Sequence, residues 1–458
     1  MKKKLSDSIS STQTIVFGFL AIILIGTALL MLPAASAEGR STPLVDALFT
    51  ATSATCVTGL MTLPVYSHWS LFGQIILLIL IQIGGLGIVA CTFTIFAILG
   101  RRITMRGRML IHEAYALDTF HGTGRIVLRI FKGTLLAEFI GAVLYGFCFI
   151  PEYGILKGIW YSVFHSVSAF CNSGIDLIGD SSFCRYVDNA MVNFTTVFLI
   201  TVGGIGFCVW WDIQRVVKNA FMQRKFRRQL FHRLSIHSKL AIVTSLILVV
   251  GGAGLLLLFE WNNPGTYGSM TVRERLMAAL FQSVTNRTAG FATVLQENYT
   301  DAGTIINLLL MFIGGSPAGT AGGVKTTTVA MLVMTVAAVI QGKQDTEIFR
   351  RKVPAENIRT GLTVVCVSFL ILLSGIMLLS IFEKTPIVNV AYEAVSALAT
   401  VGLSRSYTAS MGNAGKIIVI ILMFIGRIGP VTMALAFRVK RKARGEMREL
   451  AEGRILVG

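Results

Sequence analysis

Apolar stretches long enough to cross a lipid bilayer recur along the chain and limit what it can fold into. A hydrocarbon core about 30 Å thick requires about 20 residues of helix. We count eight such stretches, at approximately 14–34, 71–99, 127–150, 189–211, 236–259, 302–340, 360–382 and 415–437. Only 14% of the 458 residues are charged and 54% are hydrophobic, so a soluble globule would lack polar residues to cover its surface. The sequence therefore predicts an all-α polytopic membrane protein with eight spans and argues strongly against a soluble enzyme.

A shorter, moderately apolar segment lies between the two members of each successive pair of spans. These segments cover 43–60, 158–175, 272–291 and 388–403. They are too short to cross the bilayer, and a half-helix that dips in and returns is tolerated at that depth only where it lines an enclosed or watery cavity. We therefore expect four concatenated units of helix, re-entrant pore loop and helix around a central pore, at 1–100, 101–222, 223–343 and 344–458, the last with a C-terminal tail.

The positive charge is concentrated on one side of these spans. Of the 41 Lys and Arg residues, 30 lie before the first span, from Arg438 onward, or in the stretches 101–132, 215–239 and 343–359 where one unit joins the next. The positive-inside rule places those loops and both termini in the cytoplasm and makes the re-entrant segments enter from outside. A cell-membrane location thus accounts for the net charge of +18 without nucleic acid. Acidic residues of the outer loops would attract cations, although any one of them reads equally well as a solvated loop charge. They include Asp46, Asp176, Asp180, Glu383 and Glu393.

Each re-entrant segment ends in a similar short sequence. The four copies end in glycines separated by 115, 116 and 112 residues, and three of them carry Ser-Ala six and five places earlier. These glycines are Gly59, Gly174, Gly290 and Gly402. A second landmark begins 24 to 29 residues later as a Gly-Gly doublet after Ile or Val, which becomes Gly426-Arg427 in the fourth copy. Any one glycine reads as a packing or turn residue, but four at matched positions indicate a repeat.

Four such loops meeting on an axis would form a cation filter. Glycine allows the backbone to turn its carbonyls inward, and a ring of carbonyls replaces the hydration shell of a cation. Each re-entrant helix would also point its partially negative C-terminal end at the centre. The residues Thr400-Val401-Gly402 match the start of the potassium-channel filter sequence.

These motifs resemble the potassium-translocating subunits of the Ktr/Trk/HKT superfamily, most closely the KtrB type. The resemblance covers nearly the whole chain and is most specific at 286–291, 399–403 and 313–325. It implies that three rings of residues bind K⁺. These are Val57, Asn172, Thr288 and Thr400, then Thr58, Ser173, Ala289 and Val401, and finally Gly59, Gly174, Gly290 and Gly402. Plant relatives that favour sodium often have serine at the place of Gly59, so the glycine implies a preference for potassium.

The sixth apolar stretch is too long for one crossing and contains five glycines and a proline within ten residues. Neither residue type supports a continuous helix there, so we expect irregular backbone at membrane depth. The resemblance implies a gating loop made of Gly314, Gly315, Ser316, Pro317, Gly319, Thr320, Gly322 and Gly323, with Lys325 and Arg427 beside it. A phosphate-binding loop is excluded because Val324 separates the glycine from the lysine.

Two ionisable residues at membrane depth are open to alternative readings. Arg427 lies about 12 residues into its span, where it either bonds backbone carbonyls between helices or places a positive charge beside the pore in contact with the gating loop. Lys325 is close enough to a helix end to snorkel. No role follows from the sequence for Glu138, which lies in the third span.

The function that these features predict is potassium uptake, with a secondary transporter of another solute as the alternative. Secondary transporters usually show inverted or paired repeats, whereas the four copies here share one orientation. The resemblance also implies a homodimer and a cytosolic ring of RCK-type regulatory subunits that bind ATP or ADP. It leaves open whether sodium drives or only stimulates transport. No enzymatic motif and no organic cofactor site is expected for this chain.

Overall fold

The computed structural model describes residues 11–87, 91, 123–179, 181–222, 230–430 and 432–433. Within these ranges the chain is mostly helical. The strands found there are β1 (Glu347–Ile348) and β2 (Arg351–Lys352), which form a small antiparallel hairpin with Glu347 opposite Lys352. The predicted all-α secondary structure is confirmed over the described residues.

One order of elements, a long helix, a short buried helix and a second apolar helix, occurs four times. The first three sets are α2 (Ser11–Leu30), α3 (Leu44–Cys56) and α5 (Leu71–Leu86), then α8 (Thr123–Tyr153), α9 (Ile155–Phe170) and α10 (Ala190–Gly204), then α13 (Ile236–Glu260), α14 (Val272–Thr285) and α15 (Asp301–Phe312). The fourth is α17 (Ala355–Phe382), α18 (Ile387–Ala399) and α19 (Asn413–Ile428). The connections contain α4 (Val65–His68), α11 (Phe207–Met222), α12 (Leu230–Arg233), α16 (Thr326–Ile340) and four 3₁₀ turns, η1 (Pro33–Ala35), η2 (Cys184–Tyr186), η3 (Gln296–Asn298) and η4 (Thr408–Ser410).

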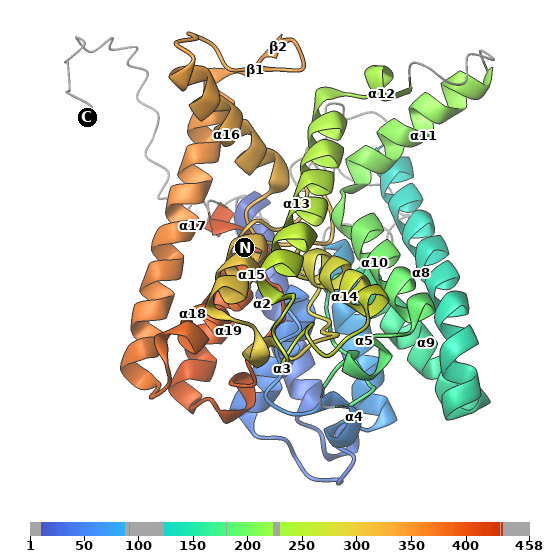
Figure 1. Cartoon of the computed structure of the whole chain (residues 1–458). Coiled ribbons are helices and arrows are strands. Elements are labelled where there is room, and N and C mark those ends of the chain that lie inside the picture. The colour runs from blue at the N-terminus through green and yellow to red at the C-terminus, as the bar shows by residue number, and fades with distance from the viewer. Residues whose placement is uncertain are drawn as a thin grey trace, which may run out of the picture.

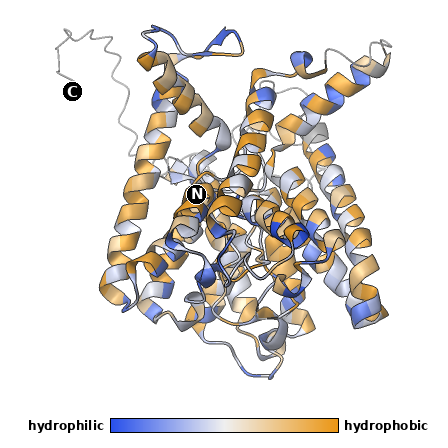
Figure 2. Ribbon diagram, viewed as in Figure 1, coloured by the Kyte–Doolittle hydropathy of each residue, from blue (hydrophilic) through white to orange (hydrophobic). Residues whose placement is uncertain are grey.

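The long first helices lie around the short ones. Figure 1 shows α8 and α17 on opposite flanks, with α3, α9, α14 and α18 between them toward the end of the molecule that carries α4. The hairpin β1–β2 and α12 lie at the other end. Apolar residues run along the long helices (Figure 2), and several of them are strongly exposed, such as Leu258 on α13 and Ile381 on α17, each 71% exposed. Such surfaces are stable against lipid and not against water.

The first helix of each unit is long and apolar enough to cross a bilayer alone, with candidate spans from 19 residues in α2 (Thr12–Leu30) to 28 in α17 (Ala355–Phe382). The second helices are shorter, between 12 and 16 residues. Each of them stops near its glycine doublet, and a glycine with left-handed backbone follows: Gly87 (φ 82°), Gly206 (97°), Gly323 (65°) and Gly429 (95°). The sequence analysis expected a break in the sixth span alone, so its treatment of 71–99, 189–211 and 415–437 as unbroken spans needs correction. Helices α10 and α11 meet at a 94° bend.

Two glutamates at or just after the C-terminal ends of first helices link these ends to the second helices of the same units. Glu260, at the end of α13, accepts hydrogen bonds from the backbone N of Thr300 at 3.1 Å and from the hydroxyl of Thr266 at 2.8 Å. Glu383, just after α17, accepts the backbone N–H of Gly412 at 3.0 Å and the hydroxyl of Tyr407. Burial and this bond to Glu383 raise the pKa of Tyr407, so the hydroxyl remains protonated and keeps donating. Thr300 and Gly412 precede the first residues of α15 and α19, so each carboxylate anchors the start of a second helix.

Replacing Glu260 should therefore destabilise the fold. The variant Glu260→Ala leaves the buried Thr266 hydroxyl without an acceptor and removes the bond to the Thr300 N–H, at a cost of about 2 kcal/mol. We expect a clear drop in the midpoint of thermal unfolding in detergent. The exposed Glu356→Ala at the start of α17 is the control and should stay within about 0.5 kcal/mol of the parent. Equal midpoints for the two variants would contradict this anchoring role.

Candidate functional site

The four short helices end in loops that share one unusual backbone. In every copy the residue two places before the repeat glycine has positive φ: Val57 (56°), Asn172 (60°), Thr288 (69°) and Thr400 (54°). The glycine two places later does as well: Gly59 (95°), Gly174 (66°), Gly290 (84°) and Gly402 (93°). A left-handed conformation is costly for β-branched residues. Its recurrence in four independent segments shows that the surrounding structure enforces it.

The four glycines form a closed ring. A methyl group added to each would overlap the carbonyl oxygen of the residue before the next unit's glycine. Gly59 faces Ser173, Gly174 faces Ala289, Gly290 faces Val401, and Gly402 faces Thr58. The ring thus runs from unit 1 through units 2 and 3 to unit 4 and back to unit 1. The predicted residues Thr58, Ser173, Ala289 and Val401 are therefore brought together by their backbone carbonyls, around one axis.

Hydroxyl groups on the short helices hold these loops. Ser53 and Ser396 accept the backbone N–H of Gly59 and Gly402, each at 3.0 Å. In the other two units the hydroxyl donates instead, from Ser168 to the carbonyl of Ile175 and from Thr285 to that of Phe291, each at 2.7 Å. The Ser-Ala landmark marked the repeat in the sequence, and the structure gives its serine a physical task.

The glycine doublets allow the second helices to pack tightly against the ends of the short helices. A methyl group at Gly84 would overlap the carbonyl oxygen of Thr55, and one at Gly203 that of Phe170. Gly426 is placed in the same way against the carbonyl of Leu398. Unit 3 differs, because Gly314 packs against Gly322 of its own following loop.

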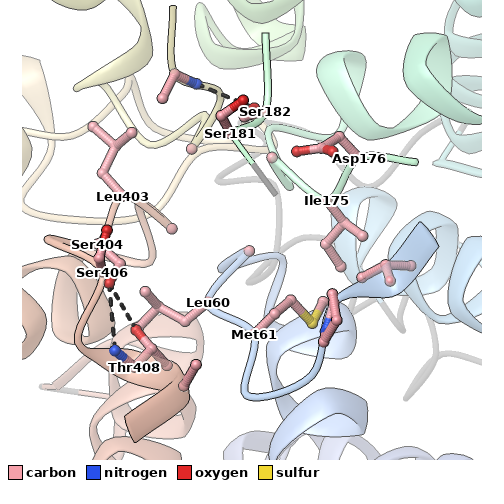
Figure 3. A pocket seen from close by; sticks show the side chains of 18 of the residues that line it. Leu60, Met61, Ile175, Asp176, Ser181, Ser182, Leu403, Ser404, Ser406 and Thr408 are labelled. Carbon is pink, nitrogen blue, oxygen red and sulfur yellow. Dashed lines mark hydrogen bonds between the residues drawn. The ribbon is translucent and has the colours of Figure 1, made fainter. Parts of the chain in front are cut away.

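A cavity of about 390 Å³ opens above the ring. The four filter glycines line it together with outer loop residues. Figure 3 shows Ile175 and Asp176 on one side of this cavity and Leu403, Ser404 and Thr408 on another. We call this cavity the vestibule.

Of the outer acids that the sequence analysis named, Asp176 lines this vestibule. The other described ones are engaged elsewhere: Asp46 forms an ion pair with Lys416 at 2.7 Å, Glu383 anchors α19, and Glu393 is buried and accepts the hydroxyls of Ser404 and Thr408. Asp180 lies outside the described residues. Of the named acids that the structure describes, Asp176 is therefore the one that remains a candidate for attracting cations to this cavity.

The glycine-rich segment between α15 and α16 is a loop that crosses beneath the ring. Its ends pair as a parallel bridge between Ile313 and Val324. On one side Ser316 N and Thr320 N donate to the carbonyls of Gly204 and Gly203 at 2.9 and 3.2 Å. The Thr320 hydroxyl also donates to the carbonyl of Phe170, the last residue of α9, at 3.1 Å.

The other side of this loop reaches unit 4. A methyl group on Gly322 would overlap the hydroxyl of Thr400 and lie 2.9 Å from the carbonyl oxygen of Ala399. The predicted gate residues are therefore placed directly against the C-terminal ends of α9 and α18, next to the predicted filter residue Thr400. Pro317 and Ala318 lie against Gly206 and Phe207, where α10 gives way to α11.

Arg427 joins three units at this level. Its guanidinium donates to the carbonyl of Thr320 in the loop at 2.5 Å, to that of Gly84, and to that of Gly85 at 3.2 Å. Both readings from the sequence thus describe the same side chain, since it bonds interhelix carbonyls and contacts the loop. Lys325 donates to the carbonyl of Ala321 at 2.7 Å, and the two cations line a cavity of about 180 Å³ between α17 and α19.

Two buried charges lie behind the ring. Glu138 is 6% exposed and accepts a hydrogen bond from the Gln82 amide at 3.3 Å. The amide oxygen of Gln82 accepts a hydrogen bond from the thiol of Cys171, the residue before Asn172. Arg287 is also 6% exposed, and its Nη2 donates to Ser245 at 2.9 Å. Arg287 lies in the segment 272–291 that the sequence analysis expected to enter from outside, and its position directly before the predicted filter residue Thr288 was the signal that it is buried.

Comparisons with known proteins agree with this geometry. The sequence matches the TrkH family, described as "Cation transport protein", over residues 2–445. It is 38% identical to the potassium/sodium uptake protein NtpJ of Enterococcus hirae, over 100% of this chain and 99% of that protein. It is 39% identical to the Ktr system potassium uptake protein B of Bacillus subtilis, over 93% of this chain and 92% of that protein.

A solved structure has the same fold. The potassium transporter TrkH from Vibrio parahaemolyticus superposes with a TM-score of 0.70 at 16% identity, covering 92% of this chain and 84% of that one. The predicted architecture of four pore-loop units with eight spans is thereby confirmed.

Proposed function

The chain belongs to the TrkH family of cation transport proteins, and from that premise we propose that it takes up potassium across the cell membrane through the ring of four loops. The observation that carries this proposal is the closed ring of glycine-to-carbonyl contacts, because such a ring gathers backbone oxygens from four units around one axis. Carbonyl oxygens gathered around one axis take the place of the water molecules that surround a hydrated cation. The relatives that are named for potassium uptake support potassium as the ion.

In this proposal three layers of the filter loops bind K⁺ through their backbone. Val57, Asn172, Thr288 and Thr400 form the inner layer, Thr58, Ser173, Ala289 and Val401 the middle layer, and the four glycines the outer layer. The left-handed backbone at the first and third positions supports this assignment, since it repeats in all four loops. The vestibule with Asp176 supplies hydrated ions to the outer layer.

We further propose that the loop 313–325 is the gate. It lies against the inner ends of α9 and α18, so an ion that leaves the filter meets it next. Arg427 holds the loop through the carbonyl of Thr320 and adds a positive charge that opposes cation passage. Lys325 adds a second charge on the same side. Movement of the loop away from the axis would open the path.

The surroundings of the chain follow from the same proposal. Both termini and the face with α12 and β1–β2 would lie in the cytoplasm, because the basic loops gather there. The chain would act as a homodimer with a cytosolic ring of nucleotide-binding subunits. The naming of two relatives as parts of a Ktr system supports a multi-subunit assembly. Sodium would stimulate uptake, and the chain itself would catalyse no chemical reaction and hold no organic cofactor.

The filter assignment predicts a loss of selectivity in Gly402→Ser and Gly290→Ser. A side chain at either site must displace a carbonyl of the neighbouring loop, which for Gly290 is the Val401 oxygen 2.6 Å away. We expect the preference for K⁺ over Na⁺ to fall at least about tenfold, which corresponds to about 1.4 kcal/mol. The measurement is K⁺ uptake by K⁺-deficient cells with Na⁺ as competitor. Gly254→Ser is the control, because no neighbouring atom lies within 4 Å of its added carbon; unchanged selectivity in both filter variants would refute the assignment.

The gate assignment predicts faster transport when the loop is weakened. Deleting 316–322, or replacing Arg427 with Gln, removes the obstruction or its charge, and initial K⁺ flux into vesicles should rise several-fold. Lys416→Gln is the control, since this lysine pairs with Asp46 away from the loop. Normal flux after the deletion would show that the loop is no gate.

The vestibule predicts a role for Asp176 in capture. In Asp176→Asn the concentration of K⁺ needed for half-maximal uptake should rise about two- to threefold at low ionic strength, while the maximal rate stays the same. The difference should shrink in high salt because the field is screened. Asp345→Asn, in the turn before β1, is the control. A lower maximal rate with unchanged half-saturation would contradict a capture role.

A further inference from the structure

Helix α11 has an exposed face of mixed character. One side of the helix is buried, with Val209, Asp212, Val216 and Ala220 spaced three and four residues apart. Beside that stripe the apolar Ile213 and Val217 remain 38% and 37% exposed. The basic Arg215 and Lys218 lie on the exposed surface as well. A helix with an apolar flank next to a basic one suits the boundary between acyl chains and headgroups.

The first turn of α11 is part of the surface on which the proposed gate rests. Phe207, its first residue, donates its backbone N–H to the carbonyl of Ala318 at 2.8 Å. Gly206, immediately before it, lies so close to the Pro317 carbonyl that a methyl group there would overlap it. Gly206 also has left-handed backbone, which permits the 94° turn. A rotation of α11 about this glycine therefore disturbs the loop directly.

The middle of α11 is attached to the next unit. Asp212 accepts the backbone N–H of Ser235, the residue that caps α13, at 2.7 Å, and pairs with Arg215. This bond fixes α11 against α13 while leaving the Lys218 side chain on the exposed surface. The helix thus connects the bilayer boundary at one end with the gate at the other.

We propose that the exposed face of α11 binds anionic phospholipid headgroups of the inner leaflet and that this contact holds the loop 313–325 in its docked position. Charge complementarity selects this occupant, since Arg215 and Lys218 are followed in the sequence by four more basic residues between 224 and 228. The inference rests on the proposed function, because it takes the loop as the gate and the face with α12 as cytoplasmic.

The direction of the effect follows from the docked arrangement. A ligand stabilises the conformation to which it binds. The orientation of α11 that meets the headgroups is the one in which Phe207 bonds Ala318, so anionic lipid favours the loop across the axis. Each basic residue near an anionic surface shifts such an equilibrium about fivefold. Anionic lipid should therefore lower K⁺ flux.

The test uses the full chain in vesicles of phosphatidylcholine alone or with about one-third phosphatidylglycerol, a content chosen to bring out the roughly fivefold effect expected per basic residue. Two quantities are measured: initial K⁺ flux, and hydrogen exchange of the α11 amides. We expect phosphatidylglycerol to lower flux about fivefold and to protect α11. Lys218→Gln should lose most of both effects, whereas Lys218→Arg, which keeps the charge, should retain them. Lys343→Gln removes a basic residue at the end of α16 and serves as the control that responds like the parent.

Each outcome decides the proposal. An equal response of the parent and Lys218→Gln, or protection of α11 that appears with an added cytosolic protein and not with phosphatidylglycerol, would overturn it. Absence of K⁺ flux from the parent in both kinds of vesicle would contradict the proposed function instead. In that case hydrogen exchange alone decides whether α11 binds anionic lipid.

Discussion

The rest of the structure depends on one repeated contact. Each of the four ring glycines packs against the backbone carbonyl of the residue that precedes the ring glycine of the next unit. Because the four contacts close into a ring, no loop can move along or around the axis without collision or loss of contact with its neighbour. The hydroxyls of Ser53 and Ser396 hold two of these loops to their own helices. Glu260 and Glu383 hold the second helices in place from outside. The long helices on the outside thus surround the ring and support the loops that form it.

That geometry has an energetic cost. Val57, Thr288 and Thr400 are β-branched and adopt left-handed backbone, at about 1–3 kcal/mol each. Contacts between units must offset this cost. Arg405 illustrates how: its guanidinium donates to the carbonyls of Gln296 and Glu297 and to the hydroxyl of Thr304, all in unit 3. The ion pair of Lys416 with Asp46 joins unit 4 to unit 1 in the same way.

The sequence was sufficient for the spans, the fourfold repeat and the glycines of the ring, because hydropathy and spacing are local properties that survive in any arrangement of the units. It was insufficient for the breaks after α5, α10 and α19, since hydropathy does not report backbone direction. The available signal was a further glycine three places after the first glycine of the doublet in these three units, as Gly87 follows Gly84. The bonding partner of Arg287 could not be identified from the sequence, because Ser245 lies 42 residues away on α13.

The loop 313–325 breaks the fourfold symmetry that the ring of glycines keeps. This difference begins at the glycine doublet of unit 3. In units 1, 2 and 4 the first glycine of the doublet packs against the end of the unit's own short helix, whereas Gly314 packs against Gly322. Residues inserted between α15 and Gly323 are thereby released to cross the axis. Arg427 replaces a glycine in unit 4 and bonds both this loop and unit 1. In the proposed function the ring draws on all four loops, whereas the element that closes the path comes from one unit, because four identical loops could not occupy the same axis.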